Sequence, residues 1–301
     1  MPRGYVPLLL LLAALWGASY LFIKVGVREL EPATLIALRL TIAFAILFGF
    51  LAARSGIARA FADLRATGRH AVVLGFINVA IPFWLIAWGE TRVDSGIAAI
   101  ANSTVPIFVA LLAIRLRPSE RANSQRLAGI LVGLVGVAVL TGVHPEGGWW
   151  AIAGTLAVVL SSVFYARSNL YTQDHFASTS PLVTATACMG VAALDMLPAG
   201  LVQLPDALPR WKAFGSAAAL AILGTALAYL ILYRMLVAYG SARTSFVAYL
   251  LPVFALAYGA LILDEPLRLN ALLGLLLILA GVALGSGLVR LPRRATVGAR
   301  P

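Results

Sequence analysis

The sequence predicts an all-α integral membrane protein whose ten transmembrane helices form two inverted repeats of five helices. Three observations support this prediction: an apolar composition, ten apolar runs of membrane-spanning length, and similarity between the two halves of the chain. Of the 301 residues, 61% are hydrophobic and 12% are charged, whereas soluble domains usually contain about 25% charged residues. The composition therefore excludes a soluble protein.

Each apolar run has the length of a transmembrane helix, which needs about 20 apolar residues. The ten runs lie at approximately residues 5–25, 33–53, 69–88, 94–114, 124–142, 149–170, 181–202, 211–234, 242–262 and 268–289. We expect the first run to be a transmembrane helix and not a cleaved signal peptide, because its apolar pattern continues in "YLFIKV" and the repeat described below requires this helix. The single cysteine, Cys188, excludes an internal disulfide and argues against a cysteine-based metal site, so we expect no cofactor.

The distribution of basic residues predicts the orientation of the chain. If both termini are cytoplasmic, 16 of the 23 Lys and Arg residues lie on the cytoplasmic side, six lie outside, and Arg39 lies within a span. Positive charge accumulates in the cytoplasmic loops of membrane proteins. We therefore expect a protein of the bacterial inner (plasma) membrane, surrounded by lipid, with both termini in the cytoplasm. The net charge of +11 then implies no nucleic-acid partner.

The second half of the chain repeats the first. The segment "DSGIAAIANSTVPIFVALLAI" from residue 94 aligns with "GSARTSFVAYLLPVFALAYGALI" from residue 240, and Ser95 matches Ser241 and Pro106 matches Pro252 at an offset of 146. Five spans in each half is an odd number, so the second copy enters the membrane in the opposite orientation. Inverted repeats are the architecture of many secondary transporters, which hold substrate near the membrane midplane.

The repeat divides the chain into four parts. Residues 1–140 form the first five-helix repeat, residues 141–148 an external linker, residues 149–290 the second, inverted repeat, and residues 291–301 a basic cytoplasmic tail. The last span of each repeat carries a small-xxx-small glycine pattern, Gly129 with Gly133 and Gly281 with Gly285, which permits close helix packing. We expect this packing within one chain, and therefore a monomer rather than a dimer.

The residues that carry these features resemble the drug/metabolite transporter superfamily, specifically its ten-helix EamA-type exporters. The resemblance covers almost the whole chain and rests on "LLAALWGASYLFIKVGVRELEPATLIALRL", the two proline helices and "LILDEPLRLNALLGLLLILAGVAL". The family pattern places a Trp-Gly pair in the first helix, here Trp16 and Gly17, and an arginine in the second, here Arg39. Its Gly-Glu turns are represented here by "RPSE" and "LDEP", which lack the Gly, so the subfamily stays open. The resemblance implies export of amino acids, including aromatic ones.

Candidate substrate-binding residues are the polar and aromatic side chains on the faces of spans 1, 3, 4, 6, 8 and 9 that we expect to point inward. They are Trp16, Tyr20, Asn78, Trp84, Trp88, Ser95, Asn102, Ser161, Tyr165, Asn169, Tyr229, Ser245 and Tyr249. Two alternatives stay open: the serines serve only close helix packing, and Trp88 belongs to the interfacial aromatic belt. Aromatic rings, hydroxyls and amides favour amphipathic zwitterions or neutral metabolites. Phosphates need several cations, which here requires Lys24, Arg39 and Arg167 to converge.

Three prolines are candidate gating residues: Pro82, Pro106 and Pro252. Proline has no backbone N–H, so the carbonyl of Asn102 or Ala248 lacks its intrahelical partner and a kink is favoured. Kinked helices at matching places in the two inverted halves predict a paired gate.

Lys24, Arg39 and Asp195 are candidate structural or coupling charges. Arg39 is expected to have a structural role and not to contact substrate. Its expected partners are Asp195, Glu29, Glu31 or helix-end carbonyls, and Asp195 is alternatively the cap of an interfacial helix end. Because Asp195 is the one carboxylate in the interior of a predicted span, Asp94 being the end residue of another, we expect facilitated diffusion or exchange rather than proton-driven transport.

An intramembrane enzyme is the alternative from another functional class. The sequence has no His-Glu-x-x-His, no Gly-x-Ser-x-Gly and no cluster of carboxylates, and its three histidines fall in loops or at helix ends. We therefore expect no enzyme but a secondary transporter, which exports amino acids or similar small amphipathic metabolites by alternating access. A passive channel or facilitator for small solutes is the nearer alternative.

Overall fold

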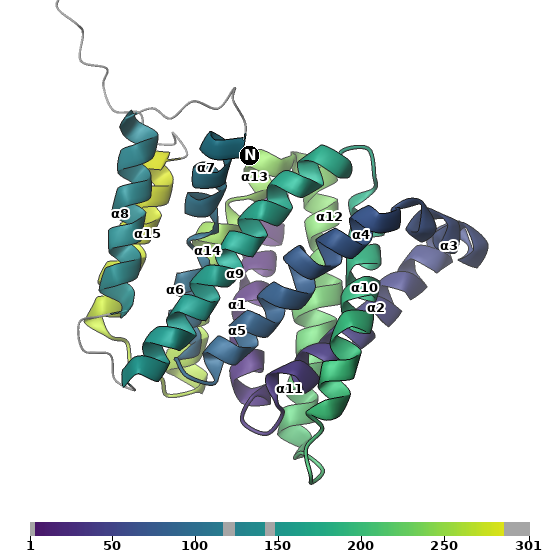
Figure 1. The fold of residues 1–301 in the computed structure, drawn as a ribbon, viewed down its shortest axis with the longest axis horizontal. Coiled ribbons are helices and arrows are strands. Elements are labelled where there is room, and N and C mark those ends of the chain that lie inside the picture. The colour runs from purple at the N-terminus through teal and green to yellow at the C-terminus, as the bar shows by residue number, and fades with distance from the viewer. Residues whose placement is uncertain (1–3, 117–123, 142–147, 286–301) are drawn as a thin grey trace, which may run out of the picture.

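The computed structural model describes residues 4–116, 124–141 and 148–285, and these residues form helices joined by short turns, with no strand among them (Figure 1). The first half contains α1 (Tyr5–Gly26), α2 (Pro32–Ser55), α3 (Ile57–Ala66), α4 (Gly68–Gly75), η1 (Phe76–Ala80), α5 (Ile81–Glu90), α6 (Ser95–Asn102), α7 (Val105–Leu116) and α8 (Ser124–Thr141). The second half contains α9 (Gly148–His175), α10 (Pro181–Val202), α11 (Trp211–Ala221), η2 (Ile222–Leu227), α12 (Ala228–Tyr239), α13 (Ser241–Thr244), α14 (Val247–Ile262) and α15 (Leu269–Gly285). Most of the predicted linker and the whole basic tail lie outside the described residues.

Seven helical stretches are long and apolar enough to cross a membrane, and three shorter apolar helices accompany them in the part of the chain that the structure describes. The seven are Tyr5–Gly26, Pro32–Ser55, Gly68–Glu90, Ser95–Leu116, Gly148–His175, Pro181–Val202 and Trp211–Tyr239. The shorter ones are Leu127–Thr141, Val247–Ile262 and Leu269–Leu284. An all-α membrane protein is thus confirmed, whereas the count of ten spans and the inversion of the halves stay predictions.

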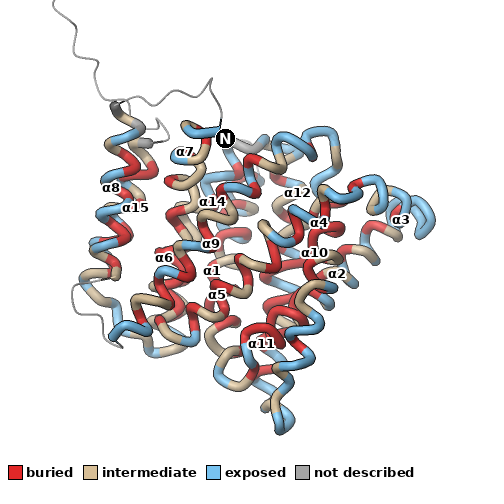
Figure 2. Tube along the Cα trace, in the orientation of Figure 1, coloured by how far each residue is buried: buried red, intermediate tan, exposed pale blue. Residues whose placement is uncertain are grey.

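Apolar side chains lie on both the inside and the outside of the bundle, as expected for a protein surrounded by lipid. Figure 2 shows the buried residues gathered in the central helices and the exposed ones along the outer faces and on α3. The exposed residues include large apolar side chains in mid-helix, such as Leu131 on α8, Leu194 on α10 and Leu276 on α15. Exposing such apolar surface to water would cost free energy, whereas exposing it to the hydrocarbon of a membrane does not.

Helices α8 and α15 lie side by side at one edge of the bundle (Figure 1). Their contact is glycine-lined: a Cβ added at Gly281 would lie 2.6 Å from the carbonyl oxygen of Gly129 and 2.5 Å from the backbone nitrogen of Gly133. Only glycine permits backbones to approach this closely. The predicted glycine patterns therefore pack against each other within the chain.

Two spans contain π-helical segments, η1 and η2, whose first residues Phe76 and Ile222 lie 146 positions apart. This is the offset at which the two halves of the sequence align. π-helical turns are rare and occur frequently at functional sites. Asn78 of η1 lines the central cavity described below, and Thr225 of η2 contacts Arg39, which lines it as well.

The helical path is interrupted between α6 and α7, at Ser103 and Thr104. Pro106, the second residue of α7, has no N–H to donate, so the helix restarts just before it. Hydroxyl groups satisfy the carbonyls freed at the break: Thr104 Oγ1 donates to the carbonyl of Ala101 at 2.7 Å, and Ser162 Oγ lies 3.4 Å from the carbonyl of Asn102. A second break separates α13 from α14, before Pro252, which itself lies inside α14.

Candidate functional site

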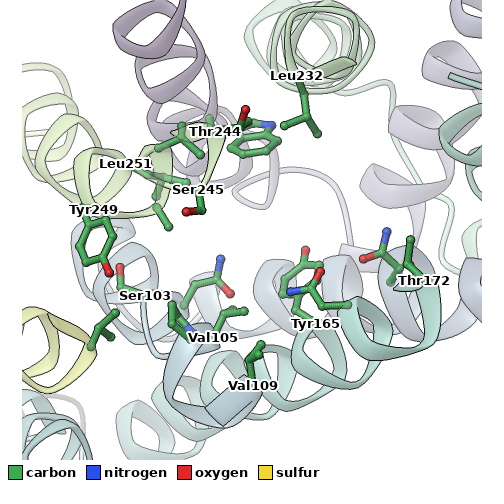
Figure 3. A pocket seen from close by; sticks show the side chains of 18 of the residues that line it. Ser103, Val105, Val109, Tyr165, Thr172, Leu232, Thr244, Ser245, Tyr249 and Leu251 are labelled. Carbon is green, nitrogen blue, oxygen red and sulfur yellow. The ribbon is translucent and has the colours of Figure 1, made fainter. Parts of the chain in front are cut away.

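A cavity of about 1060 Å³ lies at the centre of the bundle, and helices from both halves of the chain line it. Figure 3 shows Ser103 and Tyr165 on one side of the space and Leu232 and Ser245 across from them. Two of its polar lining residues, Tyr20 and Arg39, are 4% and 5% exposed. Pro181 also lines the cavity, and Pro181 and Ser245 are exposed at the surface.

The cavity reaches one face of the bundle and not the other. Its lining extends to the end of α9 and the start of α10, on the face that also holds the first turn of α1. We call this the N-terminal face. The connections that the structure describes at the opposite face, residues 27–31, 91–94, 203–210 and 263–268, contribute no lining residue. We call that side the closed end.

Nine of the predicted substrate-binding residues line the cavity. They are Trp16, Tyr20, Asn78, Asn102, Tyr165, Asn169, Tyr229, Ser245 and Tyr249, and the predicted gating residue Pro106 joins them. Hydrogen bonds connect them across helices: Asn102 Nδ2 donates to the hydroxyl of Tyr20 at 2.8 Å, and Ser168 Oγ donates to Oδ1 of Asn78 at 2.8 Å. The helices thus bring together residues from α1, η1, α6, α9, α12 and α14, although their contact with substrate stays a prediction.

Four predicted binding residues lie elsewhere: Trp84, Trp88, Ser95 and Ser161. Ser161 is fully buried and donates to the carbonyl of Val158 at 2.6 Å. Trp84 and Trp88 stack on each other, with ring centroids 6.4 Å apart, away from the cavity. The guanidinium of Arg92 lies 3.5 Å above the ring of Trp88, near the end of α5. The other two predicted gating prolines, Pro82 and Pro252, are buried and do not line the cavity either.

Polar contacts between helices hold the closed end together, one within the first half of the chain and one between the two halves. Lys24 Nζ donates to the carbonyl oxygens of Glu90 at 2.8 Å and Val93 at 2.7 Å, which ties the end of α5 to α1. Ser95, at the start of α6, binds the carboxylate of Glu265. Ion pairs or charged hydrogen bonds of this kind are natural components of a gate, because they form in one conformation and break in another.

Arg39 does not have the partners expected from the sequence. Its Nε donates to Thr225 Oγ1 at 2.9 Å, and its guanidinium carbon lies 3.7 Å above the ring of Phe83. Asp195 does not pair with it, and the buried Oδ2 of Asp195 has no hydrogen-bond partner. Glu29 accepts a hydrogen bond from the backbone N–H of Arg210 instead. Arg39 therefore lines the cavity as a cation that pairs with no carboxylate of the described residues.

Sequence reasoning also missed Glu90, which is a second carboxyl group inside the bundle. The predicted span ended at residue 88 because "GETRVD" reads as a polar loop, but α5 continues to Glu90, which is fully buried. Close packing explains the burial: a Cβ at Gly89 would lie 2.9 Å from the carbonyl oxygen of Gly154, so α5 and α9 nearly touch there. Neither carboxyl oxygen of Glu90 has a hydrogen-bond partner. Gly89, the small residue directly before Glu90, was the feature of the sequence that could have indicated this close packing.

Comparisons with known proteins agree with this architecture. The model of the EamA-like transporter family matches residues 4–142 and 152–287. An uncharacterized transporter of Archaeoglobus fulgidus is 29% identical over 91% of this chain and 95% of its own length. A protein of Salmonella typhimurium named "Probable amino-acid metabolite efflux pump" is 27% identical over 96% of this chain and 97% of its own.

Two further comparisons concern location and fold. The uncharacterized inner membrane transporter YedA of Escherichia coli is 28% identical over 85% of this chain and 83% of its own. A solved crystal structure shares the fold, with a TM-score of 0.63 and 21% identity over 96% of this chain and 98% of that one. The chain therefore belongs to the EamA-like transporter family and is a membrane transporter, not an enzyme.

Proposed function

We propose that the protein is a secondary transporter that exports amino acids or similar small amphipathic metabolites across the inner membrane by alternating access. The observation that supports this most directly is a cavity of about 1060 Å³ that reaches one face of the bundle and ends at the other. Small-molecule sites commonly have volumes of about 300–1,000 Å³. A cavity that is closed at one end also favours a carrier over a passive channel, which needs a path through both faces.

The side chains of the cavity support this class of substrate. Trp16, Tyr165 and Tyr229 supply aromatic surface, the two tyrosines add hydroxyl groups, and Asn78 and Asn102 supply amides. These groups suit molecules that combine an apolar part with a small polar head. The relatives named as probable amino-acid metabolite efflux pumps, in Salmonella typhimurium and Escherichia coli, are consistent with such a substrate.

Phosphorylated substrates fit less well, because the three cations that would have to converge are separated. Lys24 is engaged by two carbonyl oxygens at the closed end. Arg167 is exposed, does not line the cavity, and lies 5.6 Å above the ring of Tyr171. Arg39 alone is left beside the cavity, whereas phosphate sites usually combine several cations.

Alternating access is supported by features that recur in the two halves. The family model matches two stretches of similar length on either side of the predicted linker, and η1 and η2 begin at matching positions. The span that contains Pro106 and the span that contains Pro252 are each broken on the N-terminal side of the proline, although Pro252 lies further inside its helix. In inverted repeats, exchanging the conformations of the halves opens a central site to the other face. With both termini cytoplasmic, the present conformation is open inward, as an exporter is when it loads substrate.

Counterflow in proteoliposomes tests the proposed function. Purified protein is reconstituted into vesicles loaded with an excess of unlabelled L-phenylalanine, L-leucine or L-threonine, and the entry of a trace of the same labelled amino acid is followed. A carrier gives saturable entry with a transient overshoot. Saturation without overshoot, or entry that rises linearly with concentration, would identify a channel. Vesicles that transport none of the three would contradict the amino-acid substrate class.

A further inference from the structure

Arg39 is the one charged residue that lines the central cavity, among the residues that the structure describes. The other lining residues are aromatic, aliphatic, hydroxyl-bearing or amide side chains, and neither Asp nor Glu is among them. Arg39 lies on α2 and is 5% exposed. A guanidinium removed from bulk water is unfavourable unless an anion compensates it. The charge therefore has to be matched by a group from outside the protein or by water.

The protein fixes the orientation of this guanidinium but uses few of its hydrogen-bond donors. Nε donates to Thr225 Oγ1 at 2.9 Å, and one face of the group stacks on Phe83 at 3.7 Å. Thr225 is itself fixed, because its hydroxyl donates to the carbonyl of Leu220 at 2.9 Å. An arginine has five N–H donors, so four remain on Nη1 and Nη2. No atom of the described residues accepts a hydrogen bond from them, and neither nitrogen is among the fully buried polar atoms that lack a partner.

No carboxylate of the described residues is close enough to form an ion pair with Arg39. Glu90 acts on it through its field, but Glu90 is buried beyond the closed end of the cavity and does not line it. The tyrosines that lie near enough to interact electrostatically with the guanidinium, Tyr165, Tyr229 and Tyr20, also line the cavity and carry neutral hydroxyls. A planar fork of free donors beside an aromatic wall is the arrangement that binds a carboxylate in two parallel hydrogen bonds.

We propose that Arg39 binds the carboxylate of the transported substrate, and that a carboxylate is the feature by which this transporter selects its substrates. This inference rests on the transport function proposed above and names the chemical class of its substrate. Among the described residues, none offers a carboxylate in the cavity to an ammonium group. A free amino group is therefore accommodated by amide and hydroxyl oxygens but is not required, so N-acylated amino acids and other monocarboxylates are accepted as well. Amines that lack a carboxylate are rejected, because their charge repels that of Arg39.

Four probes with the same aromatic ring separate the carboxylate from the amino group. They are L-phenylalanine, N-acetyl-L-phenylalanine, L-phenylalaninamide and phenethylamine. Ligand-induced stabilisation of the purified full-length protein in detergent, followed as the shift in Tm with concentration, gives the relative affinities without requiring transport. We expect the two carboxylates to bind at least about tenfold more tightly than the amide and the amine, which corresponds to about 1.4 kcal/mol. Equal affinities, or preference for either compound without a carboxylate, would overturn the inference.

Variants of Arg39 and its neighbours assign the preference to this residue. Arg39→Gln should abolish the preference for carboxylates, and Arg39→Lys should keep only part of it, because an ammonium has the charge but not the planar fork. Arg167→Gln removes a cation from α9 outside the cavity and should leave the preference unchanged. A preference retained in Arg39→Gln would show that another group binds the carboxylate.

A second variant keeps the test decisive if Arg39→Gln does not fold. Thr225→Val leaves the charge of Arg39 in place but removes the hydroxyl that orients it. The ratio of affinities between L-phenylalanine and L-phenylalaninamide should fall, and this ratio should change more than the maximal rate of counterflow does. An unchanged ratio would contradict the inference.

The same probes distinguish failure of this inference from failure of the proposed function. Counterflow without discrimination between acid and amide refutes the role of Arg39 alone, whereas a folded protein that neither binds nor transports any of the carboxylates refutes both.

Discussion

Glu265 binds the first residue of α6 with both oxygens of its carboxylate: the N–H of Ser95 donates to Oε1 at 2.9 Å and the hydroxyl of Ser95 donates to Oε2 at 2.7 Å. The N–H of Gly96 lies 3.3 Å from Oε2 as well. The two residues are 170 positions apart, so a turn of one half of the chain caps a helix of the other. Ser95, which we expected among the substrate-binding residues, thus belongs to the contacts that close the cavity.

Glu265→Ala should destabilise the protein, because it leaves the first N–H groups of α6 without their acceptor. Loss of a helix cap costs about 1–2 kcal/mol, and the charge of the carboxylate places this contact at the upper end. The decrease in Tm in detergent measures the effect. Asp63→Ala is the matched control, since it removes an acid from the exposed Arg59–Asp63 pair at 3.0 Å, and exposed pairs contribute about 0–1 kcal/mol. An equal decrease in Tm in the two variants would show that the Glu265 cap contributes no more to stability than an exposed ion pair does.

The contact between α8 and α15 predicts that Gly281 tolerates no large side chain. A Cβ there already lies 2.5 Å from the backbone nitrogen of Gly133, so Gly281→Leu must separate the two helices or prevent their packing. Gly49 on α2 provides the control, because nothing lies within 4 Å of a Cβ at that position. We expect Gly281→Leu to lower the yield of folded protein and its Tm, and Gly49→Leu to change neither. Two variants of equal stability would contradict the close glycine packing.

The sequence predicted the helices better than the contacts between them. Apolar runs are a local property, and polar or aromatic residues within them were the candidates, of which Asn78, Tyr165 and Asn169 line the cavity whereas Ser161 does not. The partner of Arg39, by contrast, is 186 positions away in a π-helical segment, and no local pattern indicates which hydroxyl meets a given cation. Glu90 was missed for a related reason: its polarity reads as loop, and only the contact between α5 and α9 buries it.

The predicted orientation can be tested with single cysteines at exposed positions. Cys188 is 1% exposed and should contribute little background. With both termini cytoplasmic, Asp206→Cys should react with a membrane-impermeant maleimide in intact cells, and Ala62→Cys should react only after permeabilisation. Both positions are exposed and belong to connections at opposite faces of the bundle. The reverse pattern of labelling would invert the topology, and labelling of both in intact cells would contradict the assignment of the spans.

Cavity-lining residues should matter more for transport than candidates that lie outside the cavity. Asn102→Ala removes the donor to Tyr20 and a lining amide, and Tyr165→Ala removes a lining ring. We expect each to reduce counterflow about tenfold, because losing one buried hydrogen-bond partner costs about 1–3 kcal/mol. Trp84→Phe, in the aromatic pair away from the cavity, should transport normally. Normal transport by both cavity variants, with folding confirmed by an unchanged elution volume in gel filtration, would place the substrate elsewhere.

The energy source of transport follows from where the carboxyl groups lie. Proton-driven carriers commonly relay protons through intramembrane Asp, Glu or His, but neither Asp195 nor Glu90 lines the cavity. We therefore expect facilitated diffusion or exchange, in which an inward-directed pH gradient across proteoliposomes with equal substrate on both sides produces no accumulation. Glu90 adds a second candidate to this test, which the sequence alone limited to Asp195. A buried carboxyl without hydrogen-bond partners is a natural proton acceptor once the closed end opens. Accumulation that disappears in Glu90→Gln would identify Glu90 as a coupling site, and accumulation that disappears in Asp195→Asn would identify Asp195. Either result would replace exchange by proton-driven transport.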